Sequence, residues 1–333
     1  MPKTKAVVGR TITHAMSFRC GFVAIIGRPN AGKSTLVNTL VGQKVSIVSP
    51  KPQTTRNRIQ GILNRDDAQV VLIDTPGIHR PASALNRMMM DELQHALDGI
   101  DVLSLIVDAS AGFGPGDRFS LEWVKRFRGP VFLLLNKIDR VKKPTLLPLI
   151  DRYHGEFDFA EIFPISALTG EGCFDLVQGW FPYLPEVPPY FPAGQFTDQP
   201  ERFLASEIIR EKAILATREE VPHAVAVLVD SFEEKKDLIR IRATICVERE
   251  GQKGILIGKH GETIKNIGTL ARKELEEILG TKIFLETFVR VQPRWRENPV
   301  LVRQLDWRYQ LDRISEQQEV ESAEPPRAYT RKH

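Results

Sequence analysis

The first half of the chain alternates short hydrophobic runs with longer stretches of mixed polarity. The runs, in order, are FVAIIG, QVVLIDTPG, VLSLIVDAS, VFLLLNKID and IFPISAL. The stretches between them include an amphipathic segment, ALNRMMMDELQHAL, whose spacing predicts a helix. This alternation predicts an α/β domain in which a mostly parallel sheet is buried between helices. Such domains bind ligands at the carboxyl ends of their strands, where the polar motifs of this region fall.

A proline-dense segment over residues 183–200 separates this first domain, residues 20–182, from a region with a different pattern. Proline at this density disfavours regular structure, so the segment is predicted to be a linker. Residues 201–312 then predict a helix, two strands around a charged turn, another helix and a last strand, which make a smaller α/β domain. Residues 1–19, which are basic, and residues 313–333, which are polar, are predicted to be tails.

The sequence GRPNAGKS, residues 27–34, lies between the first hydrophobic run and a predicted helix. It matches the G-x-x-x-x-G-K-[ST] pattern of loops that bind nucleotide phosphates, in the strand–loop–helix context which that pattern requires. Backbone N–H groups around Gly32 would surround the phosphates, Lys33 would add positive charge, and the Ser34 hydroxyl would be a ligand for Mg²⁺. The predicted nucleotide contacts of this loop are Gly27, Asn30, Ala31, Gly32, Lys33, Ser34 and Thr35.

Two further motifs predict that the base is guanine. In NKID, residues 136–139, the Asp139 carboxylate can accept hydrogen bonds from N1–H and the exocyclic amine of guanine, donors that adenine lacks. Backbone N–H groups of SAL, residues 166–168, can donate to guanine O6. An Asn or Asp at a strand end is by itself more often a turn residue, but beside a phosphate loop these motifs favour guanine. The predicted base contacts are Asn136, Lys137, Asp139, Ser166, Ala167 and Leu168.

The motif DTPG, residues 74–77, and the polar loop PQTTRNR before it predict the metal and γ-phosphate contacts. Asp74 can hold Mg²⁺ through water, and the Gly77 N–H can face the γ-phosphate. A threonine of the polar loop should complete the metal shell, and we predict Thr55, with Thr54 as its neighbour. The predicted metal ligands are thus Ser34, Thr55 and Asp74, the predicted catalytic residues are Lys33, Thr55 and Gly77, and the further predicted nucleotide contacts are Thr75, Pro76 and Ile78.

The four motifs GRPNAGKS, QTTRN, DTPG and NKID follow one another in this order along the chain. They resemble those of the translation-factor class of P-loop GTPases, which implies a GTPase that binds GTP or GDP with Mg²⁺. Many GTPases have a glutamine after the glycine of the third motif, and it orients the attacking water. Ile78 occupies that position here, so unaided hydrolysis is predicted to be slow. Relatives with a hydrophobic residue there often have an asparagine at the position of Asn30, which implies help from K⁺ beside the phosphates.

A second glycine-framed loop, GKHG, residues 258–261, lacks the phosphate-loop frame but fits the G-x-x-G loop of KH modules. Such a loop clamps the backbone of about four single-stranded nucleotides. Gly258 and Gly261 would allow close approach, Lys259 and His260 would face phosphates, and Ile255 and Ile257 would contact bases. A plain surface turn is an equally good interpretation of these four residues.

Charge and aromatic residues favour RNA for this second loop. Residues 251–310 contain 11 Lys and Arg against 7 Asp and Glu, a surplus of 4 that equals the +4 of the whole chain. Arg294, Trp295 and Arg296 interleave basic and aromatic side chains in a way suited to stacking on bases, and we predict RNA contacts from Arg294 and Trp295. Trp295 could equally cap the core of the domain.

The motifs taken together, followed by EIIREK and GILIGKHGETIKNIG, resemble the Era family of bacterial GTPases over residues 20–312. This resemblance implies a type II KH fold in the second domain and binding of 16S ribosomal RNA near its 3′ end. It also implies a role in maturing the 30S ribosomal subunit, and peripheral contact with the inner membrane. We expect a monomer in the cytoplasm.

Composition gives no indication of disulfides, of a membrane-spanning helix or of a targeting segment. The three cysteines are far apart and fit free thiols in a reducing compartment, and no hydrophobic run approaches the length of a membrane-spanning helix. The basic first 19 residues favour a tail over a targeting presequence. Two other functions stay open: a GTPase whose second domain binds protein, and an enzyme that uses GTP as a phosphoryl donor. No motif indicates the second substrate pocket which that enzyme would need.

Overall fold

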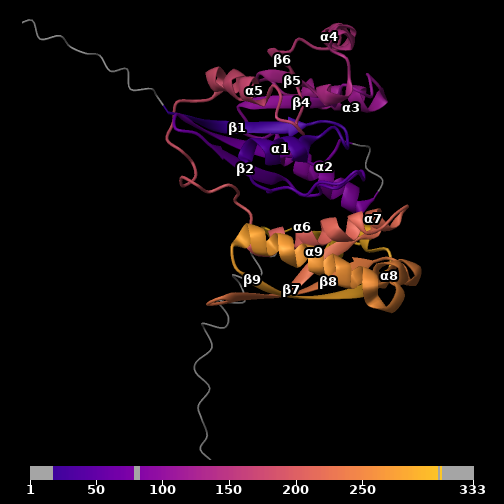
Figure 1. Ribbon diagram of the computed structural model, residues 1–333. Coiled ribbons are helices and arrows are strands. Elements are labelled where there is room, and N and C mark those ends of the chain that lie inside the picture. Colours follow the sequence, from indigo (N-terminus) through magenta and orange to yellow (C-terminus); the bar gives the residue numbers. More distant parts are fainter. Residues whose placement is uncertain (1–17, 79–82, 307, 310–333) are drawn as a thin grey trace, which may run out of the picture.

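The protein, seen here as a computed structural model, is described for residues 18–78, 83–306 and 308–309. Two α/β domains lie one above the other, joined by a single connecting segment (Figure 1). Nearly all of the predicted tail at residues 1–19, the whole tail at 313–333 and part of the loop after DTPG lie outside the described residues. Within the described part, no helix is long and apolar enough to cross a membrane.

The N-terminal domain has a six-stranded sheet in the order β2-β3-β1-β4-β5-β6, parallel except for β2. Its strands are β1 (Arg19–Ile26), β2 (Ile59–Asn64), β3 (Ala68–Asp74), β4 (Val102–Asp108), β5 (Val131–Asn136) and β6 (Glu161–Ile165). The five predicted hydrophobic runs form five of these strands. The sequence interpretation missed β2, an edge strand that pairs antiparallel with β3.

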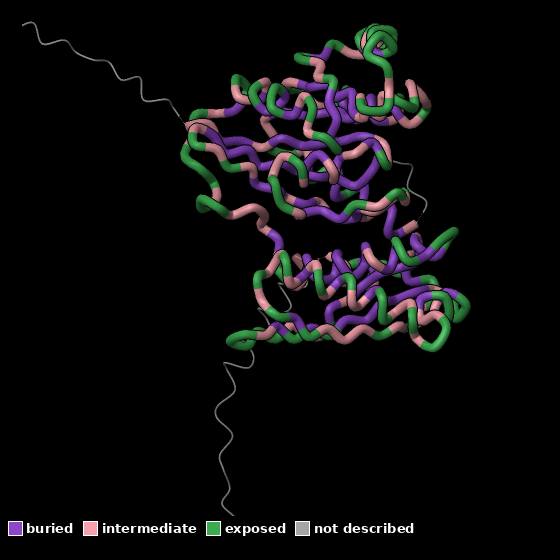
Figure 2. The backbone as a smooth tube through the Cα atoms, in the orientation of Figure 1, coloured by how far each residue is buried: buried purple, intermediate pink, exposed green. Residues whose placement is uncertain are grey.

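Helices cover both faces of this sheet. They are α1 (Lys33–Val41), α2 (Ala84–Ala96), α3 (Pro115–Val124), α4 (Leu146–His154) and α5 (Cys173–Trp180), with short 3₁₀ turns at η1 (Ile138–Arg140), η2 (Lys143–Thr145) and η3 (Phe181–Tyr183). Because side chains alternate along a strand, Ala24 and Ile26 of β1 pack with α2 and α3, whereas Val23 and Ile25 pack with α1 and α5. Buried residues therefore line every central strand (Figure 2).

The C-terminal domain has a three-stranded sheet with helices packed on one face. Its elements are α6 (Glu201–Leu215), α7 (Val221–Ala224), β7 (Ala226–Lys235), β8 (Leu238–Val247), α8 (Glu250–Ile257), η4 (Lys259–Gly261), α9 (Glu262–Leu279), β9 (Lys282–Val291), η5 (Trp295–Glu297) and α10 (Pro299–Arg303). Strand β8 pairs antiparallel with β7 and parallel with β9. Helices α6 and α9 share the core with the sheet, and α6 lies on the side toward the N-terminal domain (Figure 1).

The predicted linker is irregular, but it is bound to the N-terminal domain. Backbone N–H groups of Tyr190 and Phe191 donate to the Gln69 side chain at 2.9 and 3.0 Å, and Gln69 donates back to the Phe191 carbonyl at 2.9 Å. The ring of Tyr190 stacks on Phe22. Proline excluded helices and strands here, as predicted, but the segment is docked on the sheet and is not a free tether.

Candidate nucleotide site and candidate RNA surface

The first glycine-framed loop crosses from β1 to α1 and holds Lys33 in a buried position. Lys33 is 6% exposed, and its ammonium donates to the carbonyls of Gly27 and Arg28, both at 3.1 Å. Burial lowers the Lys33 pKa from 10.5 to about 8, opposed by the nearby Asp74 carboxylate. Gly32 at the start of α1 has φ +105°, and a Cβ there would lie 2.2 Å from the Asn136 amide. Only glycine fits this position, which confirms one structural reason for the motif.

Three predicted metal ligands lie together at the end of β3. The Ser34 hydroxyl donates to Asp74 at 2.7 Å and lies 2.9 Å from the Thr55 hydroxyl, which also reaches Asp74 at 3.4 Å. Ser46, which the sequence interpretation missed, donates to the same carboxylate oxygen at 2.6 Å. Asp74 is fully buried, and burial raises its pKa against these hydrogen bonds.

This oxygen cluster fits Mg²⁺. The second carboxylate oxygen of Asp74 has no hydrogen-bond partner among the described residues, so a buried acceptor remains available. Hydroxyl and carboxylate oxygens are the ligands that Mg²⁺ takes, together with phosphates and water. The described residues contain no cluster of three or more His, Cys, Asp or Glu suited to a metal.

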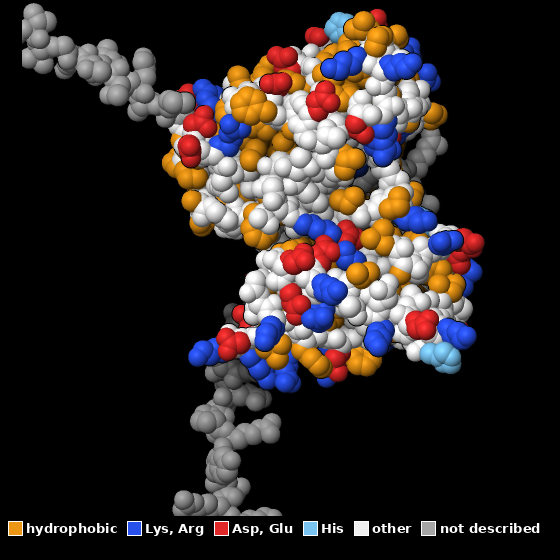
Figure 3. All heavy atoms as spheres, viewed as in Figure 1, with side chains coloured by type: hydrophobic (Ala, Val, Ile, Leu, Met, Phe, Trp, Pro, Cys, Tyr) orange, Lys and Arg blue, Asp and Glu red, His pale blue; other side chains and the backbone are white. Residues whose placement is uncertain are grey.

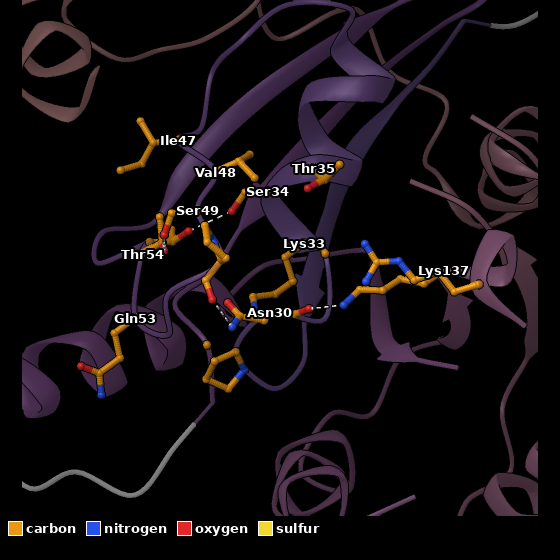
Figure 4. Close-up of a pocket in the computed structure, with 16 residues that line it drawn as sticks. Asn30, Lys33, Ser34, Thr35, Ile47, Val48, Ser49, Gln53, Thr54 and Lys137 are labelled. Atoms are coloured by element: carbon orange, nitrogen blue, oxygen red, sulfur yellow. Dashed lines mark hydrogen bonds between the residues drawn. The ribbon is translucent and has the colours of Figure 1, made fainter. Parts of the chain in front are cut away.

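A cleft of about 450 Å³ opens over this cluster (Figure 4). Its wall opposite the phosphate loop is the segment 46–57, which we call the switch loop; Thr54 bonds to Ser49 at 2.6 Å and Asn30 donates to the Pro50 carbonyl at 2.9 Å. The lining residues are Pro29, Asn30, Gly32, Lys33, Ser34, Thr35, Ile47, Val48, Ser49, Pro50, Gln53, Thr54, Thr55, Gly77, Lys137 and Arg140. Most predicted phosphate, metal and switch residues are therefore brought to one site, whereas Gly27 and Ala31 are buried and do not line the cleft.

Not all residues of DTPGI face this cleft. Thr75 is fully buried and donates to the Ile25 carbonyl at 2.8 Å, and Pro76 is buried beside it. Ile78 is 2% exposed, packs in the core with α2, and donates its N–H to the Gly27 carbonyl at 3.1 Å. The side chains of Thr75, Pro76 and Ile78 therefore lie away from the cleft, and of residues 75–78 Gly77 lines it, so the nucleotide contacts predicted for the other three stay predictions that concern their backbone.

The predicted base contacts other than Ser166, which is fully buried, line a smaller cavity of about 120 Å³ next to the phosphate loop. The Asp139 carboxylate accepts from the Ser166 hydroxyl at 2.7 Å, which orients it. Asn136 donates to the Ala31 carbonyl at 2.7 Å and accepts from the Ala167 N–H at 2.8 Å. Asn136 therefore connects the phosphate loop to SAL.

The prediction for the SAL backbone needs a correction as well. The Ser166 N–H donates to the Glu171 carbonyl at 2.9 Å and the Ala167 N–H to Asn136, so neither is available for guanine O6. Among the three N–H groups, that of Leu168 is the one for which the described residues provide no acceptor. Leu168 is also 71% exposed at the rim of the cavity.

The second glycine-framed loop is exposed to solvent, whereas the first is buried around Lys33. It joins α8 to α9, with Lys259 and His260 exposed and left-handed backbones at Gly258, His260 and Gly261. A Cβ at Gly258 would lie 2.2 Å from the Thr263 hydroxyl, whereas one at Gly261 would meet nothing within 4 Å. Ile255 is 51% exposed, in agreement with the predicted apolar contact, and Ile257 is half-buried.

Comparison with known proteins matches both domains. Residues 22–137 match the family model of the 50S ribosome-binding GTPase, and residues 220–296 match that of the KH domain. The GTPase Era of Syntrophus aciditrophicus (strain SB) is 50% identical over 295 residues, which cover 88% of this chain and 96% of that protein. The chain belongs to the Era family of GTPases.

Solved Era structures have the same two-domain fold. Era in complex with MgGDPNP and nucleotides 1506–1542 of 16S ribosomal RNA is 43% identical with a TM-score of 0.84, over 87% of this chain and 99% of that one. A point variant of Aquifex aeolicus Era bound to GDP·AlF4⁻ gives the same identity, TM-score and coverage of the two chains. The predicted fold class, a P-loop GTPase domain followed by a KH domain, is confirmed, and so is the GTPase activity.

Trp295 is buried where the KH domain packs against α2 of the GTPase domain, and its predicted stacking on a base is wrong in this structure. The indole is 2% exposed, donates to the Ala224 carbonyl at 2.8 Å, and carries the Arg56 guanidinium 5.4 Å from its ring centroid. A large ring with a single donor is fully satisfied in such a pocket. Its neighbour Arg294 is exposed, and its predicted RNA contact stays a prediction.

The sequence interpretation also missed the contacts that hold the switch loop of this Era-family GTPase to its KH domain. Arg210 of α6 donates to the Thr54 carbonyl at 2.5 Å, and Glu211 accepts from the Val48 N–H at 2.9 Å. Arg56 donates to the Val225 carbonyl at 2.8 Å. The charged residues of EIIREK gave a signal, because Arg210 and Glu211 follow the hydrophobic Ile208 and Ile209 directly in the sequence, and all four are buried in α6.

Proposed function

We propose that this chain is a GTP-dependent switch that binds 16S ribosomal RNA near its 3′ end and acts in maturation of the 30S ribosomal subunit. The proposal is supported by family membership, by the relative solved with MgGDPNP and a 16S fragment, and by the open GKHG loop. Location in the cytoplasm, with peripheral contact at the inner membrane, follows from the same resemblance and is proposed with it.

The residues of the cleft have distinct roles in this proposal. GTP with Mg²⁺ would occupy the cleft, where the metal neutralises phosphate charge and Ser34, Thr55 and Asp74 hold it. Lys33 would exchange its two carbonyl partners for phosphate oxygens, and Asp139 would select guanine. Because Ile78 is in the core, no side chain at that position orients water, which supports slow unaided hydrolysis. The side-chain oxygen of Asn30, at the cleft rim, would be a ligand for K⁺.

The observation that carries the switch proposal is that one segment contacts both the nucleotide cleft and the KH domain. The switch loop contributes Thr55 to the metal cluster and, one residue on either side, Thr54 and Arg56 to the KH domain. If the γ-phosphate repositions Thr55, the bonds on either side of it must adjust. Nucleotide state and KH placement are therefore coupled through covalent neighbours.

The test is titration of the 3′-terminal 16S segment into protein loaded with GDP and then with a nonhydrolysable GTP analogue. We expect RNA affinities that differ by about 5- to 150-fold, the usual range of coupling free energies, and a reciprocal change in nucleotide affinity. Gly261→Asp adds negative charge where a side chain has space, and it should lower RNA affinity in both states. Gly261→Asn is the matched control without the charge. Equal RNA affinity in the two nucleotide states would exclude the switch.

A further inference from the structure

The face of the KH sheet that points away from its helices exposes two phenylalanines. Phe284 and Phe288 of β9 are 50% and 51% exposed, whereas Ile283 between β9 and the helices is 4% exposed. Four residues apart on a strand, the two rings share one face at a separation of about 13 Å. Half-exposed aromatic rings in this arrangement indicate a surface for contact with a partner.

Arginines alternate with these rings across the sheet. In the strand register Arg240 lies opposite Phe284, Arg242 opposite Glu286, and Arg290 two positions beyond Phe288. The Arg240 guanidinium lies 5.8 Å from the Phe284 ring centroid. Arg242 has one exposed acidic neighbour, Glu286, at 3.7 Å. We call Arg240, Arg242, Phe284, Phe288 and Arg290 the outer sheet surface. Basic and hydrophobic side chains lie next to each other along the lower edge of the KH domain in Figure 3, where Figure 1 places its sheet.

The outer sheet surface is continuous with the GKHG loop through α8. A hollow of about 640 Å³ is lined by Phe288 and Arg290 together with Lys253 of α8, the helix that ends at Gly258. The acidic residues Asp230 and Glu250 also line it. Over strands β7–β9 this face carries Lys235, Arg240, Arg242, Lys282 and Arg290 against Asp230, Glu233 and Glu286.

We propose that the outer sheet surface binds a second stretch of single-stranded RNA, continuous with the strand held at the GKHG loop. Bases stack on Phe284 and Phe288, and the arginines of β8 and the end of β9 contact phosphates, a combination of aromatic platforms and basic side chains that suits single strands. Arginine is well matched to this role because it binds phosphate and also stacks on rings. The inference rests on the RNA binding proposed above and extends its footprint to the opposite face of the domain.

A tryptophan reporter tests the stacking directly. In the described part of the chain Trp123, Trp180 and Trp295 are buried, so Phe288→Trp adds an exposed fluorophore at the proposed site. An RNA of about 20 nucleotides from the 16S 3′ end, longer than one G-x-x-G groove, should quench this variant more than the parent protein. An RNA of about four nucleotides should fill the GKHG groove without that quenching. Quenching by neither RNA would overturn the proposal.

Affinity measurements give an independent readout. Phe284→Ala with Phe288→Ala should lower affinity for the long RNA about tenfold or more and leave the short RNA unchanged. The control is Phe174→Ala, which removes a 63% exposed phenylalanine with Arg65 at 5.3 Å in the GTPase domain. Arg240→Gln with Arg290→Gln should reduce the salt slope of long-RNA binding by about 1.4, or about 0.7 per phosphate contact.

The two proposals fail separately. If Gly261→Asp lowers binding of both RNAs while the phenylalanine pair changes neither, the GKHG loop binds RNA and the outer sheet surface does not. If Gly261→Asp has no effect on either RNA, the function proposed for the loop itself is wrong. A protein found to bind the outer sheet surface, with long-RNA affinity unaffected by the phenylalanine pair, would also overturn the inference.

Discussion

The two glycine-framed loops each place a lysine after a glycine, in opposite surroundings. In the first, Lys33 is 6% exposed and hydrogen-bonded to two carbonyls, below a cleft of about 450 Å³. In the second, Lys259 is exposed on a short turn between two helices. The first loop is pre-formed around a small ligand that it encloses, while the second presents its backbone to a ligand that passes over it.

The glycine before the lysine is closely packed in both loops, because a Cβ at Gly258 would lie 2.2 Å from the Thr263 hydroxyl, but the glycine that closes each loop differs. Gly32 is required because Asn136 fills the space that a Cβ would need, so the first loop is packed by its own protein. Gly261 has open space around it, and a positive φ is its only structural demand. Open space beside a glycine of the second loop is what close approach of a nucleic-acid backbone requires. The same residue pair can therefore serve a mononucleotide or a strand, depending on what surrounds it.

The largest expected effect is from Lys33→Ala, which should lower GTP affinity about hundredfold or more, because a desolvated phosphate then loses its cation. Lys259→Ala, the same change in the second loop, should leave GTP affinity unaltered. Both values come from titration with a fluorescent GTP analogue. A similar loss in both variants would mean that the two loops are not specialised as their surroundings indicate.

Sequence patterns predicted five of the six strands of the N-terminal domain and the helices around both loops, because these elements depend on local periodicity. They missed β2, whose short run IQGILN lies at the sheet edge and has no long hydrophobic stretch. Motifs also led us to predict ligand contacts for residues whose side-chain directions a sequence pattern does not give. Thr75, Ile78 and Trp295 were predicted to contact ligands and are buried, since burial depends on elements that only the fold brings together. For the same reason Ser46 was not predicted.

The second prediction uses the lowered pKa of Lys33, about 8 against an ordinary 10.5. Below pH 8 the ammonium is present in free and bound protein, so this group adds no pH dependence to GTP binding. Above pH 8 the free protein loses the proton that phosphate binding needs, and affinity should fall by up to about tenfold per pH unit. Titration between about pH 7 and 9 measures this, and Lys33→Arg, which stays charged, should remove the slope.

The lowered pKa of Lys33 has the opposite effect on folding stability from its effect on GTP affinity. Because burial lowers the folded-state pKa of Lys33, the charged form is penalised in the nucleotide-free protein below about pH 8. The unfolded chain binds the proton more tightly, so this group makes the free energy of unfolding rise from about pH 8 to 10.5. If GTP affinity stayed constant up to pH 9 in the parent protein, the pKa of Lys33 would not be lowered to about 8.

The smallest expected effect is at the border between the domains. Lys44, just before the switch loop, pairs with Glu211 of α6 at 2.6 Å and with Glu274 of α9, and it lies outside the lining of the nucleotide cleft. Lys212 pairs with the same two carboxylates, so Lys44→Met leaves neither acid without a cation, and the fold should persist. Partly exposed ion pairs contribute about 0.2–1 kcal/mol. The variant should therefore reduce the factor that couples nucleotide state to RNA affinity by about two- to fivefold, with GTP affinity in the absence of RNA unchanged.

Lys125→Met, which removes an exposed pair with Glu122 within the GTPase domain, is the matched control. If both variants left the coupling factor as in the parent protein, the charges at this border would not transmit the state of the first loop to the second, and the backbone contacts at Thr54 and Arg56 would have to do so alone.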